Sequence, residues 1–433
     1  MNFTLPPGFI RARWTGFSLL AAGFVLGFFH RIAPAVVAPD LVRDFAIPAA
    51  ALGSLSAMYY YVYTAMQIPS GIVSDTLGPR YTVSAAGLIA ALGTLVFATA
   101  TSFEAAAWGR LLVGLGASFT FIGLMKYNTL WFEPQRYGAI SGLTLMIGNL
   151  GAILAAAPLA LLLEFTGWRQ IFLVIGGLSL GLSLWILLAL RNRPEDAGFP
   201  SLAELAGGAP PRPPAHHWSR EIFGALSNRD VWPGFVVMFG LTGTGLAFVG
   251  LWSVPLLTDV HGMSRSAAAT ATTVMLVGSA LGSFFAGSLS DALGRRRPIA
   301  IVSGVVAVLC WLALGGLPEL SAQGVWFLFA LLGLCAGGGT VSYAVAKEVS
   351  PPLFAGMAMA IVNTGLFLGA AVVQAVFGAV MDWGWQGELI NGLRGYGPAD
   401  YQRGLLLCTG CAALGLVASL RLRETYCRHL TVE

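Results

Sequence analysis

The sequence predicts an all-α membrane protein: twelve transmembrane helices in two six-helix bundles, with both termini cytosolic. Three observations predict this fold. The 433 residues are 56% hydrophobic and only 10% charged, whereas a typical soluble domain has about 25% charged residues. Apolar runs of about 20 residues, the length of a membrane-crossing helix, follow one another along the chain. A polar turn motif recurs at half the chain length, which indicates internal duplication.

The apolar runs predict helices, because a helix satisfies its own backbone in lipid and the short alternation of a membrane β-barrel is missing. The first half of the chain gives spans at 14–38, 51–73, 81–101, 105–130, 138–162 and 170–190. The second half gives spans at 231–257, 267–289, 298–317, 323–347, 355–381 and 403–421. The first run is too long for a signal peptide, so we expect it to remain as an uncleaved span.

The basic residues predict the orientation of these spans. Most of them, including Arg11, Arg80, Arg295 and Arg428, fall on the face that carries both termini. By the positive-inside rule this face is cytosolic, and we expect a multi-pass protein of the cell inner (cytoplasmic) membrane. The net charge of +4 therefore reflects topology, and we expect no nucleic-acid partner.

Polar stretches predict how the bundles are connected. The segment 191–229 contains four prolines and several charges, which is typical of a linker: Pro210, Pro211, Pro213 and Pro214. We therefore expect an N-terminal bundle at 1–190, a cytosolic linker at 191–229, and a C-terminal bundle at 230–433 with a short cytosolic tail. A long outer loop is expected at 382–402, with Trp383, Trp385 and Tyr396 at the membrane interface.

Ionisable residues at membrane depth are costly, and they mark candidate functional sites. Arg31 lies about 10 Å from the outer end of the first span, and Lys126 about 6 Å from the cytosolic end of the fourth. Arg110 lies one to two turns into the fourth span, and no Asp or Glu lies in the middle of any predicted span. Cations without acids favour a substrate with a carboxylate or other anionic group. The alternatives are bonds from Arg31 and Arg110 to backbone carbonyls, and a Lys126 that reaches the interface.

Other polar groups extend the candidate site. His30 is the best-placed titratable group for coupling to protons, and packing between helices is its alternative role. Seven further residues at similar depth are candidates for substrate binding: Tyr59, Tyr63, Gln67, Asn128, Trp252, Tyr343 and Asn363. Hydrogen bonding between helices is their alternative role. A G-x-S-x-G match at 177–181 lacks a nearby base and acid, and no P-loop is present. We therefore expect no enzyme activity, no cofactor and no metal site.

The repeated motif indicates a family. Gly71–Arg80 reads GIVSDTLGPR and Gly287–Arg296 reads GSLSDALGRR, with matching positions 216 residues apart. This turn resembles motif A of the major facilitator superfamily, and Arg110–Gly116 resembles its motif B. Thr76 and Pro79 replace usual basic residues of motif A, and Ala157-Pro158 replaces the Gly-Pro pair of drug antiporters.

The resemblance covers essentially the whole chain and implies two bundles around a central cavity. It implies a cytosolic gate at Gly71, Asp75, Gly78, Arg80, Glu133, Gly287, Asp291, Gly294 and Arg296. Asp75 would cap a helix of the opposite bundle, and Arg80 would pair with Glu133. The segment from His30 to Pro69 is also similar to the bacterial branch with phagosomal nutrient transporters, which implies uptake of small nutrients.

These observations together predict a secondary active transporter working by alternating access. Its substrate would be a small carboxylate-bearing or zwitterionic organic solute, taken up with protons as the candidate coupling ion in symport. The alternative is efflux of a metabolite, siderophore or drug by proton antiport. The expected partners are the small-molecule substrate and membrane lipid, and we expect a monomer.

Overall fold

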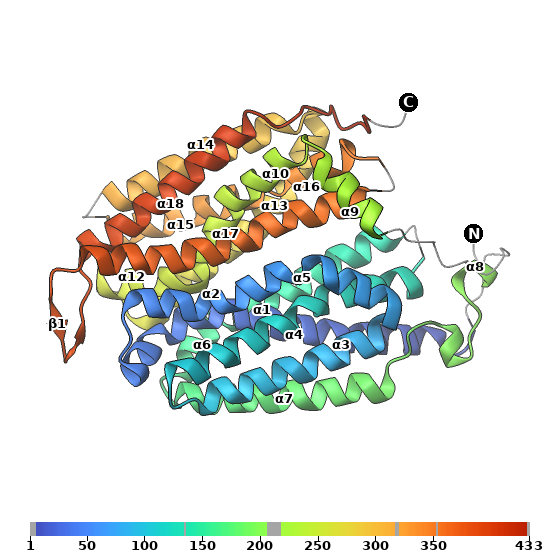
Figure 1. Cartoon of the computed structure of the whole chain (residues 1–433), viewed down its shortest axis with the longest axis horizontal. Helices are drawn as coiled ribbons and strands as arrows, with labels where there is room; N and C mark the ends of the chain where they lie inside the picture. Colours follow the sequence, from blue (N-terminus) through green and yellow to red (C-terminus); the bar gives the residue numbers. More distant parts are fainter. Residues whose placement is uncertain (1–5, 134–135, 206–217, 317–319, 352–353, 431–433) are drawn as a thin grey trace.

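The computed structural model describes residues 6–133, 136–205, 218–316, 320–351 and 354–430, which are mostly helical. The helices of residues 1–190 form one group, and those of residues 230–433 form a second group beside it (Figure 1). We call these groups the N-terminal and C-terminal halves. Both chain termini lie at one end of the molecule, which we call the terminal end. A small β-hairpin lies at the opposite end, which we call the hairpin end (Figure 1).

The N-terminal half consists of α1 (Phe9–Phe45), α2 (Ala49–Ala65), α3 (Gln67–Thr99), α4 (Phe103–Trp131), α5 (Tyr137–Leu154), α6 (Ala157–Leu162) and α7 (Trp168–Ala189). The connecting segment holds η2 (Glu195–Ala197), α8 (Leu202–Leu205) and α9 (Trp218–Ser227). Four of its prolines, Pro210, Pro211, Pro213 and Pro214, lie outside the described residues.

The C-terminal half begins with a broken helix made of α10 (Trp232–Val237), η3 (Met238–Gly243), α11 (Thr244–Ala247), η4 (Phe248–Trp252) and α12 (Ser253–Asp259). It continues with α13 (Arg265–Leu293), α14 (Arg297–Gly316), α15 (Ala322–Gly338), α16 (Val341–Glu348), α17 (Ala355–Gly384), β1 (Leu389–Ile390), β2 (Leu393–Arg394) and α18 (Pro398–Ser419). The elements η3 and η4 are π-helical, a geometry common at functional sites.

In the described residues, eleven helical stretches are long and apolar enough to cross a membrane. The expected spans at 51–73 and 81–101 form α2 and α3, which divide differently. The helix bends at Met66 (φ −88°, ψ 0°) and leaves helical geometry at Gly78 (φ 76°, ψ 167°). A positive φ favours glycine, which has no Cβ to clash. The turn of the first motif therefore lies inside α3, and the number of twelve spans stays a prediction.

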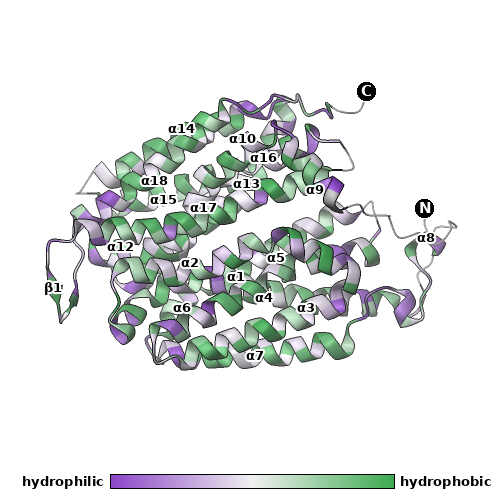
Figure 2. Ribbon diagram, in the orientation of Figure 1, coloured by the Kyte–Doolittle hydropathy of each residue, from purple (hydrophilic) through white to green (hydrophobic). Residues whose placement is uncertain are grey.

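The surface of the helices fits a lipid environment. Large apolar side chains face outward on both halves, with Leu188 of α7 72% exposed and Phe284 of α13 67% exposed. Figure 2 shows hydrophobic residues along the outer helices and hydrophilic ones gathered toward the helix ends. In water such a surface would be an aggregation liability, whereas lipid solvates it. The protein is therefore a multi-pass membrane protein.

The expected loop at 382–402 contains a hairpin that the sequence analysis missed. Leu389 pairs with Arg394 and Ile390 with Leu393 in antiparallel register. Between them Asn391 (φ 53°) and Gly392 (φ 80°) form the turn, and Asn-Gly is a strong hairpin signal. Of the three expected interface aromatics, Trp383 is 87% exposed, while Trp385 and Tyr396 hydrogen-bond within this region.

The two halves are joined mainly toward the hairpin end. There Arg265 pairs with Asp40 at 2.9 Å. The Ala50 amide donates to Asp382 Oδ2 at 2.8 Å, at the start of α2. Toward the terminal end, the last polar bond between the halves runs from Asn363 Nδ2 to Gln67 Oε1 at 2.7 Å. Beyond that bond, the described parts of the two halves share no hydrogen bond or ion pair.

Candidate functional site

Arg31 lies where α1 and α2 meet α17, and it is only 7% exposed. Its guanidinium carbon is 4.4 Å from the ring centroid of Phe28, 4.7 Å from Tyr63 and 5.0 Å from Phe367. Rings at these distances attract a cation. Its Nε donates to Tyr59 Oη at 3.1 Å, which fixes the plane of the guanidinium. We call Arg31 with these four aromatic residues the Arg31 cluster.

Arg31 has no acidic partner within the described residues, where ion pairs occur at many other positions. Its guanidinium interacts with two tyrosine hydroxyls, that of Tyr59 through Nε and that of Tyr63. A buried charge is costly unless it is paired. The aromatic faces offset part of this cost, and the planar guanidinium, unpaired with any acid of the described residues, presents a fork that suits a carboxylate or phosphate.

A chain of neutral polar groups extends this cluster across the two halves. Tyr343 Oη donates to Asn363 Oδ1 at 2.6 Å, and Asn363 Nδ2 donates to Gln67 Oε1 at 2.7 Å. Gln67 lies one turn from Tyr63, whose ring centroid is 4.2 Å from that of Phe367. The structure thus brings together six predicted substrate residues: Arg31, Tyr59, Tyr63, Gln67, Tyr343 and Asn363.

Two other predicted residues, Arg110 and His30, lie next to this cluster inside the N-terminal half. Arg110 donates from Nη1 to the His30 carbonyl at 3.0 Å, and its guanidinium carbon is 5.3 Å from the Tyr59 ring. His30 Nε2 lies 3.2 Å from Thr94 Oγ1, and its Nδ1 has no partner in the described residues. Arg110 therefore holds the backbone beside Arg31, and His30 faces α3.

Two other predicted residues lie in separate packing contacts. Asn128 Nδ2 donates to Thr144 Oγ1 at 3.1 Å, between α4 and α5. Trp252 Nε1 donates to the Gln374 carbonyl at 3.1 Å, and its ring stacks on Phe377. Both side chains are buried. These contacts are interhelical, and the described structure shows none between these residues and the Arg31 cluster.

The side chains of Asp75 and Arg80 in the first motif bond to residues of the N-terminal half. Lys126 Nζ lies 2.7 Å from Asp75 Oδ1, so this lysine neutralises the motif acid. Arg80 donates from Nε to the Leu187 carbonyl at 2.8 Å. Glu133 pairs with Arg13 at 3.1 Å, so the pairing of Arg80 with Glu133 implied by the family is not formed in this arrangement. Asp75 likewise caps no helix of the other half here.

The motif glycines Gly71 and Gly287 have free space around them. A Cβ built on either one would meet no atom within 4 Å. Gly294 has a positive φ of 61° and ends α13. This matches a helix end in the left-handed conformation.

The second motif forms a denser network. Arg296 donates to Asp291 Oδ1 at 2.5 Å and to Glu348 Oε1 at 2.7 Å. Thr425 of the C-terminal tail donates to Glu348 Oε2 at 2.5 Å. Burial would lower the pKa of Arg296, but the hydrogen bonds to Glu348 and Asp291 raise it above its ordinary value. The tail after α18 is thereby tied to the second motif.

Sequence reasoning missed one symmetric feature of the two motifs. Asn192 Oδ1 accepts the backbone amide of Arg80 at 2.8 Å, and Glu424 Oε1 accepts that of Arg296 at 2.8 Å. Each acceptor follows the last long helix of its half. Neither belongs to a motif, so only a comparison of the two halves beyond α7 and α18 could have indicated them.

The chain matches a known family along most of its length. A sequence model described as Major Facilitator Superfamily matches residues 19–264 and 241–393. A probable hexose phosphate transport protein of Chlamydia pneumoniae is 24% identical, with 85% of each chain covered. A probable sulfoacetate transporter, SauU, of Cupriavidus necator is 22% identical, with 86% of this chain and 88% of that protein covered.

The fold also matches a solved structure. A bacterial homologue of the human lysosomal transporter Spinster, in an inward-facing and unoccupied conformation, superposes with a TM-score of 0.73. The match covers 95% of this chain and 98% of that one, at 19% sequence identity. The two chains therefore share their fold.

Proposed function

This chain belongs to the major facilitator superfamily, and from that premise we propose that it carries a small organic anion across the membrane by alternating access. It is a transporter of small organic solutes and not an enzyme, as its relatives are transporters. The solute that we propose carries a carboxylate or other anionic group, either as a net anion or as one end of a zwitterion. The observation that carries this proposal is the unpaired, buried guanidinium of Arg31.

Because Arg31 has no acidic partner among the described residues, we expect the substrate to carry one anionic group that pairs with it. The two terminal nitrogens of Arg31 can bind both oxygens of a carboxylate or phosphate, in the planar geometry that favours Arg over Lys. The neutral chain Gln67–Asn363–Tyr343 offers amide and hydroxyl groups for the polar remainder of the solute. The names of two relatives support an anion, because hexose phosphate and sulfoacetate both carry negative charge.

The orientation follows from the basic residues. The terminal end faces the cytosol, and the hairpin end faces outward from the inner membrane. Residues 1–190 and 230–433 form two bundles that rock about the Arg31 cluster, joined by the linker 191–229. The contacts between the halves at the hairpin end support closure of the outward-facing side. The pair of Asp75 and Lys126 belongs to the gate at the terminal end, on the cytosolic side.

Proton coupling is part of the proposal and rests on His30. This residue adjoins Arg31 in sequence, and its Nδ1 is free of partners in the described structure. No carboxylate pairs with Arg31 in that part of the chain, so we assign proton coupling to His30, whose ring lies against Thr94 of α3 on the other side of α1 from the Arg31 cluster. The monomer is proposed as the transporting unit, because both bundles come from one chain.

The test is transport and binding with purified protein. A thermal-shift screen of carboxylates, organophosphates, sulfonates, amines and neutral sugars finds the ligand, and counterflow in proteoliposomes confirms transport. We expect Arg31→Gln to weaken binding of the best anion about 10- to 100-fold, since hydrogen bonds to charged groups contribute about 1.5–3 kcal/mol. Arg31→Lys should restore only part of this, and Arg220→Gln, an exposed arginine of α9, should have no effect.

Two results would overturn the proposal. One is an organic cation or neutral sugar as the best transported ligand. The other is full anion transport by Arg31→Gln with wild-type affinity. Accumulation against imposed proton gradients of either direction then separates uptake from efflux and tests the role of His30 with a His30→Gln variant.

A further inference from the structure

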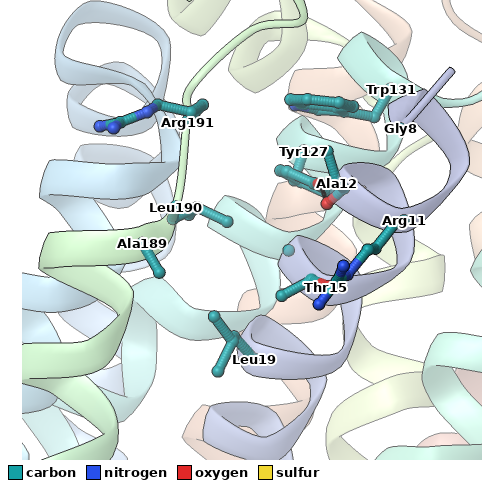
Figure 3. A pocket seen from close by; sticks show the side chains of 11 residues that line it. Gly8, Arg11, Ala12, Thr15, Leu19, Tyr127, Trp131, Ala189, Leu190 and Arg191 are labelled. Carbon is teal, nitrogen blue, oxygen red and sulfur yellow. Dashed lines mark hydrogen bonds between the residues drawn. The ribbon is translucent and has the colours of Figure 1, made fainter. Parts of the chain in front are cut away.

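A cavity lies at the terminal end of the N-terminal half, between α1, α4 and α7. Its volume is about 250 Å³, and Arg11, Thr15, Leu19, Trp131, Leu190 and Arg191 are among its lining residues. Figure 3 shows Arg11, Thr15 and Leu19 on one wall, from α1, and Leu190 on the opposite wall, after α7, while the Arg191 side chain extends away from α1 at the rim. The cavity belongs to one half only, so it is separate from the Arg31 cluster.

The two arginines of this cavity are free. Arg11 and Arg191 are exposed and form no ion pair or side-chain hydrogen bond with the described residues. Their neighbour Arg13 differs, since it is buried and paired with Glu133 at 3.1 Å. No Asp or Glu lines the cavity. The described lining of this cavity therefore contains two arginines and no acidic residue.

The rest of the cavity is apolar and continues along the helices. Leu19, Ala189 and Leu190 line its inner part. Further along the seam between α1 and α7, a smaller space is lined by Gly23, Leu26, Leu182 and Ile186. A Cβ on Gly23 would meet no atom within 4 Å, so the seam has room beside this glycine. We call this stretch the α1–α7 seam.

We propose that this cavity binds the headgroup of an anionic phospholipid. The lipid phosphate binds Arg11 and the Thr15 hydroxyl, Arg191 at the rim adds a second positive charge for the headgroup, and one acyl chain follows the α1–α7 seam. Basic pockets between transmembrane helices on the cytosolic side are suited to such headgroups. A free phosphate ion would satisfy the arginines but leave the apolar seam unused. The inference uses the membrane orientation proposed above and is independent of the substrate.

The experiment is native mass spectrometry of delipidated full-length protein in detergent. The added probes are cardiolipin, phosphatidylglycerol, the zwitterionic phosphatidylethanolamine, and inorganic phosphate. We expect anionic lipids to bind more tightly than phosphatidylethanolamine. Arg11→Gln/Arg191→Gln should weaken anionic-lipid binding about 25-fold, since each arginine near an anionic lipid contributes roughly a factor of five.

Two further variants make the result specific. Arg421→Gln/Arg428→Gln removes the same charge from exposed arginines of the C-terminal tail and should leave lipid binding unchanged. Gly23→Leu keeps both arginines but fills the seam, and it should weaken lipid binding without changing phosphate binding. Each variant must keep the wild-type melting temperature.

Three outcomes would overturn the proposal. The first is equal weakening by the tail variant, which would indicate non-specific attraction. The second is inorganic phosphate binding that matches lipid binding and ignores Gly23→Leu, which would indicate a soluble anion site. The third is unchanged lipid binding in Arg11→Gln/Arg191→Gln. Because no transport is measured, failure here is distinct from failure of the proposed transport function.

Discussion

In the Arg31 cluster, one phenol hydroxyl orients the guanidinium. Tyr59 Oη accepts from Arg31 Nε at 3.1 Å and donates to the Gly27 carbonyl at 3.3 Å. We expect Tyr59→Phe to weaken binding of the anionic substrate about fivefold, because a hydrogen bond of this kind contributes about 1 kcal/mol. Isothermal titration calorimetry measures the dissociation constant of the substrate for each variant. Tyr61→Phe is the control, as Tyr61 is 41% exposed, and equal effects of the two variants would exclude this role.

A second prediction at the residue scale concerns pH. Burial would raise the pKa of Glu133, but its own backbone amide and the Arg13 guanidinium hold it below its ordinary value. A lowered pKa stabilises the fold above the unfolded value of about 4.3, and this contribution is lost as the pH falls through the folded value. Glu133→Gln should therefore lower the melting temperature at pH 7, and its melting temperature should converge with that of the wild type as the pH falls below the lowered pKa of Glu133 in the folded protein.

The matched control for Glu133 is Glu164→Gln. Glu164 is exposed between α6 and α7 and has no bonded partner in the described structure. It should show no pH-dependent difference from wild type. A constant offset for Glu133→Gln from pH 7 to pH 3 would show that the carboxylate charge does not matter there.

The sequence indicated the polar residues of the site but not their neighbours. Arg31 stood out because an intramembrane cation is costly, and that argument needs no structure. Phe367 did not stand out, because it is one of 26 phenylalanines and becomes special only through its contact with Arg31. Asn128 and Trp252 had the right depth, but depth alone does not tell which side of a helix faces another half.

Among the helices, α14 depends on a residue that lies far along the chain. The Glu424 carboxylate accepts the backbone amides of Arg296 at 2.8 Å and Arg297 at 3.1 Å, at the start of α14. An anion at a helix N-terminus stabilises it. We expect Glu424→Ala to cost about 0.5–2 kcal/mol, seen as a lower melting temperature in detergent.

Glu388→Ala, in the exposed hairpin, is the control for Glu424→Ala. Its side chain makes no bond in the described structure, so the melting temperature should stay at the wild-type value. Glu424→Gln should lie between the two, because it keeps an acceptor oxygen but loses the charge. Wild-type stability of Glu424→Ala would show that the tail does not support α14.

The helices were predicted from hydrophobicity, and their irregularities were not. The apolar runs placed the spans because lipid requires helices of a certain length. The bend at Met66 and the π-helical turns of η3 and η4 are not encoded in a run of apolar residues. The hairpin did carry a local signal, Asn391-Gly392, which is visible without any structure.

For the whole molecule, the contacts between the halves predict an asymmetric cross-linking pattern. Asp40→Cys/Arg265→Cys, in a background without the five free cysteines, should be bridged by a short bis-methanethiosulfonate, because the native side chains touch at 2.9 Å. Bridging should stop counterflow, since the hairpin end can no longer open. Reduction should restore transport.

The matched pair at the terminal end is Gly71→Cys/Gly356→Cys. Both positions lie beyond the last polar bond between the described halves, and a Cβ at either one meets no atom within 4 Å, so we expect less bridging of this pair than of Asp40→Cys/Arg265→Cys under the same conditions. Efficient bridging at the terminal end and none at the hairpin end would contradict the arrangement described. Full counterflow by the bridged Asp40→Cys/Arg265→Cys variant would contradict the moving-halves proposal.

The duplication was predictable at this scale, because two copies of one motif lie 216 residues apart. The conformation was not predictable. Whether the halves touch at one end or the other depends on contacts between them such as Arg265 with Asp40, and on pairs within one half, such as Asp75 with Lys126, that engage the gate residues. Residue types alone do not give that balance.

The empty surroundings of Gly71 and Gly287 have a consequence for evolution and engineering. A glycine inside a helix costs about 0.5–1 kcal/mol relative to alanine, and neither position recovers that cost through a close contact in this structure. Alanine at either site should therefore make this conformation more stable. If the opposite conformation brings a helix against these positions, the same change will slow the transport cycle. The two glycines would then mark where thermostability and turnover conflict, and where a conformation-locked variant is most easily made.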